Sequence, residues 1–179
     1  MRILLLTMAL IGLAGPAAAQ NAGQIARVKA GAGCPRCNLF QADLAGANLR
    51  GRNFSGARLR QADLSSVLAG HARFAGGDLR DLNAYGATMG GADFARTDLT
   101  NATFVGAYLV GANFAGAHLD GTNFSGAEMA RARGLTRGQL SRCQTSRPRH
   151  FRPGKVRAFQ VGARKIGPHQ IGSDEGGVG

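Results

Sequence analysis

The sequence predicts an all-β fold in which the middle of the chain forms a solenoid of short, stacked coils. Two observations lead to this prediction. A strict period of five residues runs from Cys37 to Arg131, and it matches neither the 3.6-residue period of a helix nor the two-residue period of a flat strand. The composition also lacks bulk, with 28 glycines among 179 residues, no tryptophan and only 6% aromatic residues. Such a composition suits regular stacks of small and medium side chains better than an ordinary globular core.

Residues 1–19 have the features of a cleavable secretory signal. Arg2 supplies a positive start, an apolar run follows from Ile3 to Leu13, and three alanines end at Ala19. We expect cleavage before Gln20. The apolar run is short of the ~20 residues that span a bilayer, although an uncleaved anchor stays open as an alternative. The prediction is therefore a periplasmic or secreted protein with no transmembrane segment after signal cleavage.

The repeat consists of 19 consecutive five-residue blocks without an insertion. Leu, Phe or Met fills 17 of the 19 central positions, and Ala fills 12 of the positions two residues earlier. Asn or Asp fills 11 of the positions between these two, and Gly fills 11 of the closing positions. Glycine tolerates the positive φ of tight turns, and Asn and Asp bond readily to turn backbone. Each block therefore combines an apolar central residue with residues that favour tight turns.

This pattern resembles the pentapeptide-repeat family, whose members carry A-[DN]-[LF]-x-x blocks, and the resemblance covers residues 37–131. It implies a right-handed quadrilateral β-helix with four blocks to each coil, which makes about 4.75 coils from 19 blocks. It further implies that the central residue and the small residue two before it point inward. The C-x-x-C that leads straight into the first block is similar to that of some exported bacterial members.

Four blocks per coil predict that residues 20 apart stack, and the sequence has the expected columns. One column is entirely leucine and another entirely phenylalanine: Leu39, Leu59, Leu79, Leu99 and Leu119, then Phe54, Phe74, Phe94 and Phe114. Two central positions shrink, at Ala69 and Ala84, and the inward position of the same block grows, to Val67 and Leu82. This exchange keeps the interior filled. Arg52 occupies an inward position, and we expect its side chain to reach outward.

Both ends of a solenoid need covering, because terminal coils expose open edges. We expect residues 20–36 to cover the first coil. Residues 132–143 are predicted to cover the last, with Thr136 capping a short helix that lays Leu135 and Leu140 on it. Residues 144–179 show no period and are predicted to form a basic disordered tail.

The three cysteines are Cys34, Cys37 and Cys143. A redox reading of the C-x-x-C needs a βαβ context, haem attachment needs a histidine at position 38, and a zinc site needs a second pair. We favour a structural disulfide between Cys34 and Cys37, formed in an oxidising compartment. Cys143 is then either free or joins two chains in a homodimer.

Positive charge belongs mainly to the end of the chain. Residues 37–131 contain eight arginines and eight acidic residues, whereas residues 132–170 contain ten Lys or Arg and no acid. Outside the cytoplasm, this tail is suited to anionic lipid or an acidic envelope polymer, although it is equally explained as a solvated extension. Nucleic acid is not the expected partner in that compartment.

The outward positions contain a candidate binding patch on two adjoining sides of the middle coils: Leu68, Tyr85, Val105, Tyr108 and Val110. The alternative is scattered surface apolar residues. Arg58 and Asp78 share an outward column and are expected to form a surface ion pair. His71 and His118 are isolated, and the sequence offers no catalytic, cofactor-binding or metal-binding constellation.

The leading hypothesis is a non-enzymatic scaffold of the cell envelope that presents a β-helix face to a protein or surface polymer. The resemblance supplies an alternative, because some cytoplasmic members of the family mimic duplex DNA and bind topoisomerases. That mimicry requires an acidic rod, and residues 37–131 are neutral. A third hypothesis is a structural protein tethered to anionic surfaces by its basic tail.

Overall fold

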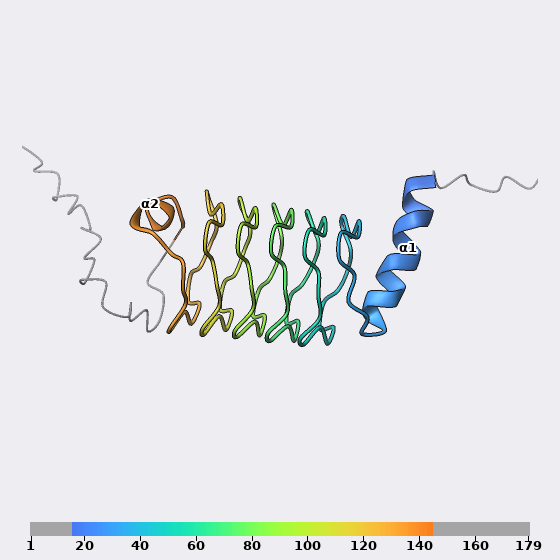
Figure 1. Ribbon diagram of the computed structural model, residues 1–179, viewed down its shortest axis with the longest axis horizontal. Helices are drawn as coiled ribbons and strands as arrows, with labels where there is room; N and C mark the ends of the chain where they lie inside the picture. Colours follow the sequence, from blue (N-terminus) through green and yellow to red (C-terminus); the bar gives the residue numbers. More distant parts are fainter. Residues whose placement is uncertain (1–15, 145–179) are drawn as a thin grey trace, which may run out of the picture.

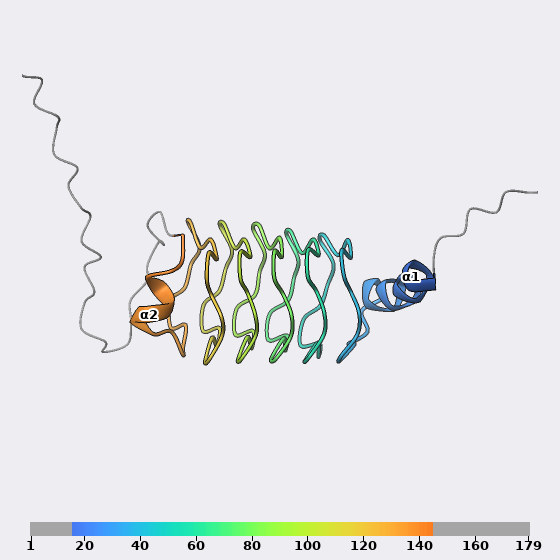
Figure 2. The same cartoon turned by 90° about the horizontal axis from the view of Figure 1, so that it is seen from above.

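The computed structural model describes residues 16–144, so residues 1–15 of the predicted signal and all but the first residue of the predicted tail lie outside the described residues. Two helices, α1 (Pro16–Lys29) and α2 (Arg137–Leu140), lie at opposite ends of a shaft of stacked coils (Figures 1 and 2). Within 16–144, no helix is long and apolar enough to cross a membrane.

The shaft is built from parallel pairings between residues 20 positions apart. Asn38 pairs with Arg58 and Arg58 with Asp78, and the same step recurs on the other three sides of the coil. Each pairing is an isolated bridge flanked by turns, so the sides are too short to be strands. The 20-residue step confirms the predicted register of four blocks per coil.

Each corner is a tight turn closed by a backbone hydrogen bond. The carbonyl of a central residue accepts from the N–H three residues later, as in the 3.1 Å bond from Ala42 to Leu39. The last residue of each block has positive φ, for example 67° at Gly106 and 55° at Arg96. A type II turn requires this conformation at its third residue, which explains why glycine predominates there. All nine non-glycine residues with positive φ in residues 16–144 occupy this corner position.

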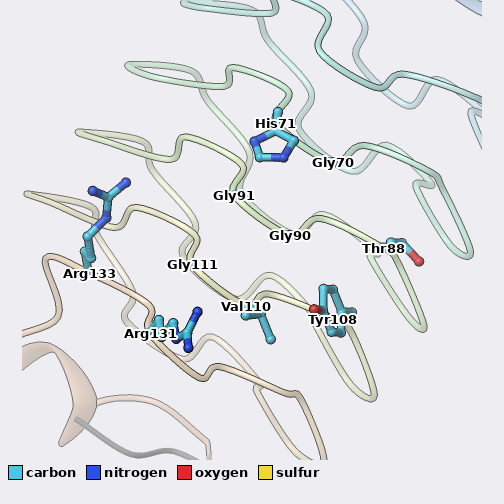
Figure 3. A pocket seen from close by; sticks show the side chains of 10 residues that line it. All are labelled: Gly70, His71, Thr88, Gly90, Gly91, Tyr108, Val110, Gly111, Arg131 and Arg133. Atoms are coloured by element: carbon cyan, nitrogen blue, oxygen red, sulfur yellow. The ribbon is translucent and has the colours of Figure 1, made fainter. Parts of the chain in front are cut away.

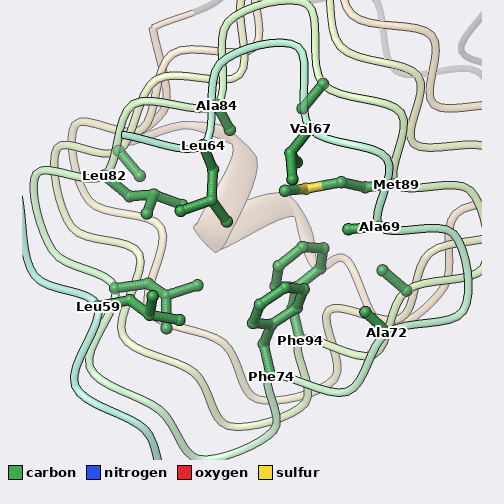
Figure 4. Close-up of a cluster of buried hydrophobic side chains, with 14 of the residues drawn as sticks. Leu59, Leu64, Val67, Ala69, Ala72, Phe74, Leu82, Ala84, Met89 and Phe94 are labelled. Atoms are coloured by element: carbon green, nitrogen blue, oxygen red, sulfur yellow. The ribbon is translucent and has the colours of Figure 1, made fainter. Parts of the chain in front are cut away.

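The predicted columns fill the interior (Figure 4). Phe94 stacks on Phe74 with ring centroids 5.2 Å apart, and on Phe114 at 5.3 Å. Phe104, from an adjoining side, meets Phe94 edge-on at 5.7 Å. All four rings are fully buried. Such ring pairs add stability beyond the area they bury. Because Phe94 contacts rings in its own column and in the adjoining one, it stabilises both columns.

The two irregular blocks keep the interior full, as predicted. Val67, Ala69 and Ala84 are fully buried, and Leu82 is 1% exposed. Figure 4 shows Val67 and Leu82 reaching into the interior beside the small alanines of their own blocks. The larger inward residue therefore replaces the volume that the central alanine lacks, and the register continues unchanged.

The surface arginines agree with the predictions only in part. The side chain of Arg52 is exposed, as expected. The ion pair predicted between Arg58 and Asp78 is wrong, because Asp78 instead accepts two 2.8 Å hydrogen bonds from Nε and Nη2 of Arg80. Asp78 and Arg80 flank the same central residue and both point outward, so Arg80 presents its guanidinium to the carboxylate in bidentate geometry.

The hydrogen-bond ladder begins one block before the predicted first block. Cys34 donates to the carbonyl of Asn53 at 2.8 Å, just as Phe54 donates to Arg73 one coil later. Cys34 therefore occupies a central position in the phenylalanine column, and Cys37 occupies the small inward position of the next block. Both side chains are buried, and they form a disulfide with their Cα atoms 5.5 Å apart.

The N-terminal end is covered by a helix that the sequence did not predict. The last turns of α1 contact the first coil, where Val28 is fully buried and Ile25 packs against the core. Gln24 Oε1 accepts a 2.8 Å bond from the backbone of Asn38, and Lys29 forms a 3.1 Å ion pair with Asp43. The C-terminal part of α1 therefore closes the open end of the shaft.

The C-terminal helix was predicted and is present as α2. The hydroxyl of Thr136 accepts from the backbone N–H of Gln139, and Oε1 of Gln139 accepts in turn from the backbone N–H of Thr136. Leu135 packs against the core, and Leu140 is half-buried. After α2 the chain returns to the coil, where Gln144 pairs with Asn123. This returning segment, which the sequence did not predict, covers the final rung.

Replacing Phe94 by alanine should lower the free energy of unfolding by about 3–5 kcal/mol, because the cavity cannot collapse between stacked rings. Urea denaturation of the full chain measures this. Ala95→Ser is the matched surface control, since serine already occupies position 55 of the same column, and it should change stability by less than about 0.5 kcal/mol. Equal effects of the two changes would contradict the stacked core.

The corner conformation predicts different costs for adding one methyl group at two glycines. Gly106→Ala should lower the free energy of unfolding by about 1–2 kcal/mol, because alanine is strained at the φ of 67° that Gly106 adopts. The added Cβ meets no atom within 4 Å, so the backbone conformation alone causes this cost. Gly70→Ala is the control, because Gly70 lacks positive φ and its added Cβ meets only the carbonyl of Gly90, at 3.7 Å. In thermal unfolding, Gly106→Ala should have a clearly lower melting temperature than Gly70→Ala, and the reverse order would refute the corner assignment.

Candidate binding surface

The five residues of the predicted patch, which we call the apolar face, occupy three outward columns on two adjoining sides of the shaft. Tyr85 and Val105 lie in one corner column, Leu68 and Tyr108 lie along the next side, and Val110 lies at the following corner. The side chains of Tyr85 and Tyr108 are 59% and 44% exposed, and the other three residues are half-buried. The face thus extends over two adjoining sides of the shaft, and two tyrosines protrude from it.

Part of the apolar face borders a hollow of about 640 Å³ (Figure 3). Its residues come from four successive coils at one corner of the shaft: Gly70, His71, Thr88, Gly90, Gly91, Tyr108, Val110, Gly111, Arg131 and Arg133. We call it the glycine hollow. The structure brings Tyr108 and Val110 into it and leaves Leu68, Tyr85 and Val105 outside.

Two rings lean onto the glycine floor from neighbouring coils. If these glycines carried a Cβ atom, the one at Gly90 would lie only 2.8 Å from the ring of Tyr108, and the one at Gly91 only 2.6 Å from the ring of His71. These glycines are therefore needed for close approach, and Gly91 also has φ 66°. His71 was set aside in the sequence as isolated. The structure instead places it at one end of the hollow, with Arg131 and Arg133 at the other (Figure 3).

The backbone at this corner differs from that of the other corners. Where Asn or Asp precedes the central residue, its side chain accepts from the N–H two residues later, as Asp63 does from Ser65 at 2.9 Å and Asp93 from Ala95 at 3.1 Å. In the column of the hollow only Asn48 makes this bond, to Arg50. The following coils have Leu68, Thr88, Tyr108 and Glu128 at that position. The loss of Asn and Asp from one column was the sequence signal that could have located the site.

Unlike the glycine hollow, the side of the shaft that contains Asp78 has a network of paired charges. The guanidinium of Arg80 lies 2.8 Å from Asp78 and 3.7 Å from Asp98. Hydrogen bonds from Arg80 hold the pKa of Asp78 below its ordinary value, and the same pair raises the pKa of Arg80. Because these charges satisfy one another, this side is less available than the glycine hollow for a charged ligand.

Phe40 is a further exposed aromatic residue that the predicted patch omitted. It is 37% exposed and lies in the corner column of Arg60 and Arg80, away from the apolar face. A second hollow, of about 510 Å³, lies beside the end of α1 and is lined by Lys29, Ala30, Gly31, Asn48, Arg50 and Arg52. Lys29 is already paired with Asp43 there.

Cys143 lies half-buried on the last rung and is not joined to another cysteine of residues 16–144. Its thiol donates toward the carbonyls of Leu119 and Gln139 at 3.4 and 3.3 Å. Burial, with a further contribution from Asp120, raises the pKa of this thiol to about 11. Across the same described range, no three His, Cys, Asp or Glu side chains are grouped as metal ligands would be.

The family profile of pentapeptide repeats matches in eight copies, over overlapping stretches that together span residues 37–143. The chain belongs to the pentapeptide-repeat family. With this membership, the four-sided coil described above is the right-handed quadrilateral β-helix of pentapeptide-repeat proteins.

Solved pentapeptide-repeat structures are similar to this chain at low identity. One from the thylakoid lumen of Arabidopsis thaliana is 24% identical, with a TM-score of 0.45, and the match covers 55% of this chain and 72% of that one. Rfr23 from the cyanobacterium Cyanothece 51142 is 22% identical over 72% of this chain and 95% of its own, with a TM-score of 0.41. QnrB1, a plasmid-mediated fluoroquinolone resistance protein, is 21% identical over 64% of this chain and 70% of its own, with a TM-score of 0.28. No curated protein matches the chain.

The raised pKa of Cys143 predicts slow alkylation of the native protein. At pH 8 its thiolate fraction should be about a hundredfold below that of a thiol with the ordinary pKa of 9.0, and alkylation should accelerate as the pH rises toward 11. Mass spectrometry after iodoacetamide treatment measures this. In unfolded, unreduced protein Cys143 alone should label quickly, whereas labelling of Cys34 and Cys37 without reductant would exclude their disulfide.

Proposed function

We propose that this protein is an exported, non-enzymatic binding protein of the cell envelope that presents one face of its β-helix to a protein or surface polymer. The protrusion of Tyr85 and Tyr108 from the apolar face is the observation that carries the proposal. Large aromatic side chains are costly to expose and are enriched among the residues that dominate binding energy. A rigid shaft fixes their positions, so little conformational entropy is lost when a partner binds.

Two features at the N-terminal end support this location. Residues 1–19 have the composition of a cleavable signal, and Cys34 and Cys37 are placed to form a disulfide. Disulfides persist in oxidising compartments such as the bacterial periplasm. A periplasmic or secreted protein is consistent with both features.

The two other functions make different demands on the chain. A duplex-DNA mimic that binds a topoisomerase needs a strongly acidic rod, whereas residues 37–131 contain equal numbers of arginines and acidic residues, eight of each. Tethering to anionic surfaces would use the basic residues of 144–179, which lie outside the described residues. Binding by the apolar face differs from both, because apolar contacts weaken little as salt rises.

The proposal predicts that capture of a partner depends on the two tyrosines. Residues 20–179, used as bait in an envelope extract, should lose at least tenfold of the captured material when Tyr85→Ser and Tyr108→Thr are combined. Serine and threonine already occupy these columns at Ser65 and Thr88, so the fold should be kept. Quantitative mass spectrometry at 0.05 and about 0.3 M salt measures the loss.

Phe40→Thr is the matched control, because it removes an exposed aromatic from another column in which Thr100 already stands. It should leave capture unchanged. A bait ending at residue 146 keeps the final pairing of Gln144 and tests the tail. Undiminished capture by the double tyrosine variant, or capture that disappears with the tail or with salt, would contradict the proposal. Capture of a topoisomerase through the shaft would support the DNA-mimic alternative.

A further inference from the structure

The glycine hollow contains backbone donors that nothing in the described part of the chain satisfies. We call the N–H of the residue that follows each central residue the corner N–H. On four successive coils this group, at Gly70, Gly90, Val110 and Ala130, has no hydrogen-bond acceptor within residues 16–144. Unpaired corner amides elsewhere in the shaft are isolated ones, at Arg60, Ala75, Val105 and Asp120. Only here do they form a continuous row, spaced by about 4.8 Å, the distance between neighbouring strands.

The carbonyls of the same residues are already occupied. Gly70, Gly90 and Val110 accept bonds of 2.8–2.9 Å from the next residue of the preceding coil's corner, namely Gly51, His71 and Gly91. At the residues of this row the carbonyls are therefore engaged, whereas the N–H groups are left to donate. A ligand rich in hydrogen-bond acceptors fits such a row of donors.

The side chains around the row add positive charge and an apolar platform. Arg131 and Arg133 line the C-terminal end of the hollow, and neither forms an ion pair within the described residues. The guanidinium group is planar and binds carboxylates in bidentate geometry. Tyr108 is 44% exposed, and its ring lies against Gly90, next to the donors.

We propose that the glycine hollow binds an acidic polysaccharide built from carboxylated sugars. Sugar hydroxyl and carboxylate oxygens would accept from the corner amides, Arg131 and Arg133 would bind a carboxylate, and Tyr108 would pack against the apolar face of a sugar ring. The hollow crosses four coils, so the row of donors extends over about 14 Å. This inference rests on the proposed function, because it names the class of surface polymer that part of the same surface would bind.

Nucleic acid is the acceptor-rich rival, and the charge distribution argues against it. Affinity for a phosphate backbone comes mainly from many Lys and Arg contacts. The basic residues among those that line the hollow are two arginines and His71, and the shaft from 37 to 131 has no net charge. A row of neutral amides with few charges suits a polymer of hydroxyls and carboxylates better than one of phosphates.

Tetragalacturonate is the probe, and its fully methyl-esterified form is the matched neutral ligand. Isothermal titration of the full chain in 0.15 M salt should detect tetragalacturonate and show at least tenfold weaker binding of the ester. Arg131→Gln should weaken tetragalacturonate about tenfold or more, as expected for a lost charged hydrogen bond. Arg96→Gln is its control, because Arg96 occupies the same corner position outside the hollow, with a φ of 55° against 58° at Arg131.

A second variant removes one donor without altering any charge. Thr88→Asn restores the side chain that, in other columns, accepts from the corner N–H, so it should occupy the N–H of Gly90 and weaken binding about three- to tenfold. Thr103→Asn does the same to Val105 at a different corner and should leave affinity unchanged. Both variants should fold, since Asn83 and Asn123 already flank Thr103 in its column and Asn48 stands in that of Thr88.

Three results would overturn the inference. Equal affinity for the methyl ester would exclude carboxylate recognition, and insensitivity to both Arg131→Gln and Thr88→Asn would place binding elsewhere, for instance on the tail. If a single-stranded oligonucleotide bound more tightly than tetragalacturonate, and Arg131→Gln weakened its binding, the hollow would be a site for a phosphate polymer. Partner capture that depends on Tyr85 but not on Arg131 would leave the proposed function standing and remove only this ligand.

Discussion

The structure depends on one constraint, the backbone hydrogen-bond ladder that joins each block to the block 20 residues further along. Every side of the coil is too short to hold itself, and each is fixed only by the coils above and below. The ladder therefore places residues of the same block position directly over one another. Identical side chains stack inside the shaft, and the chemistry of each outward column is repeated or varied one rung at a time.

Inside the shaft, this constraint makes neighbours of residues that are distant in sequence. Phe94 contacts Phe74 and Phe114 because they share a column, and it contacts Phe104 because the adjoining column carries a ring at the same level. The same logic explains Cys34 and Cys37. They occupy two successive inward positions at the N-terminal end, so their disulfide fills the level at which the phenylalanine column would otherwise continue.

On the outside, the ladder turns small sequence differences into surfaces. Asn and Asp close most corners of three columns by accepting from the corner amides, and the fourth column has no such closure after Asn48. The same corner carries glycines, so rings from neighbouring coils can rest on its backbone. The glycine hollow is therefore a consequence of what one column lacks. The apolar face arises beside it because its apolar residues occupy columns in which the other rungs have small or polar side chains.

The sequence by itself determined the period of five, the four-block coil, the inward columns, the compensation at Ala69 and Ala84, and the cap at Thr136. Each of these is set by local backbone preference repeated at a fixed interval, so spacing alone reveals it. Only the tertiary structure decided the helix at 16–29, the earlier start of the ladder at Cys34, the pairing of Asp78 with Arg80, and the gathering of His71, Tyr108 and Arg131 around one hollow. These features depend on which way a side chain leans and what lies one coil away, and such contacts leave no period in the sequence.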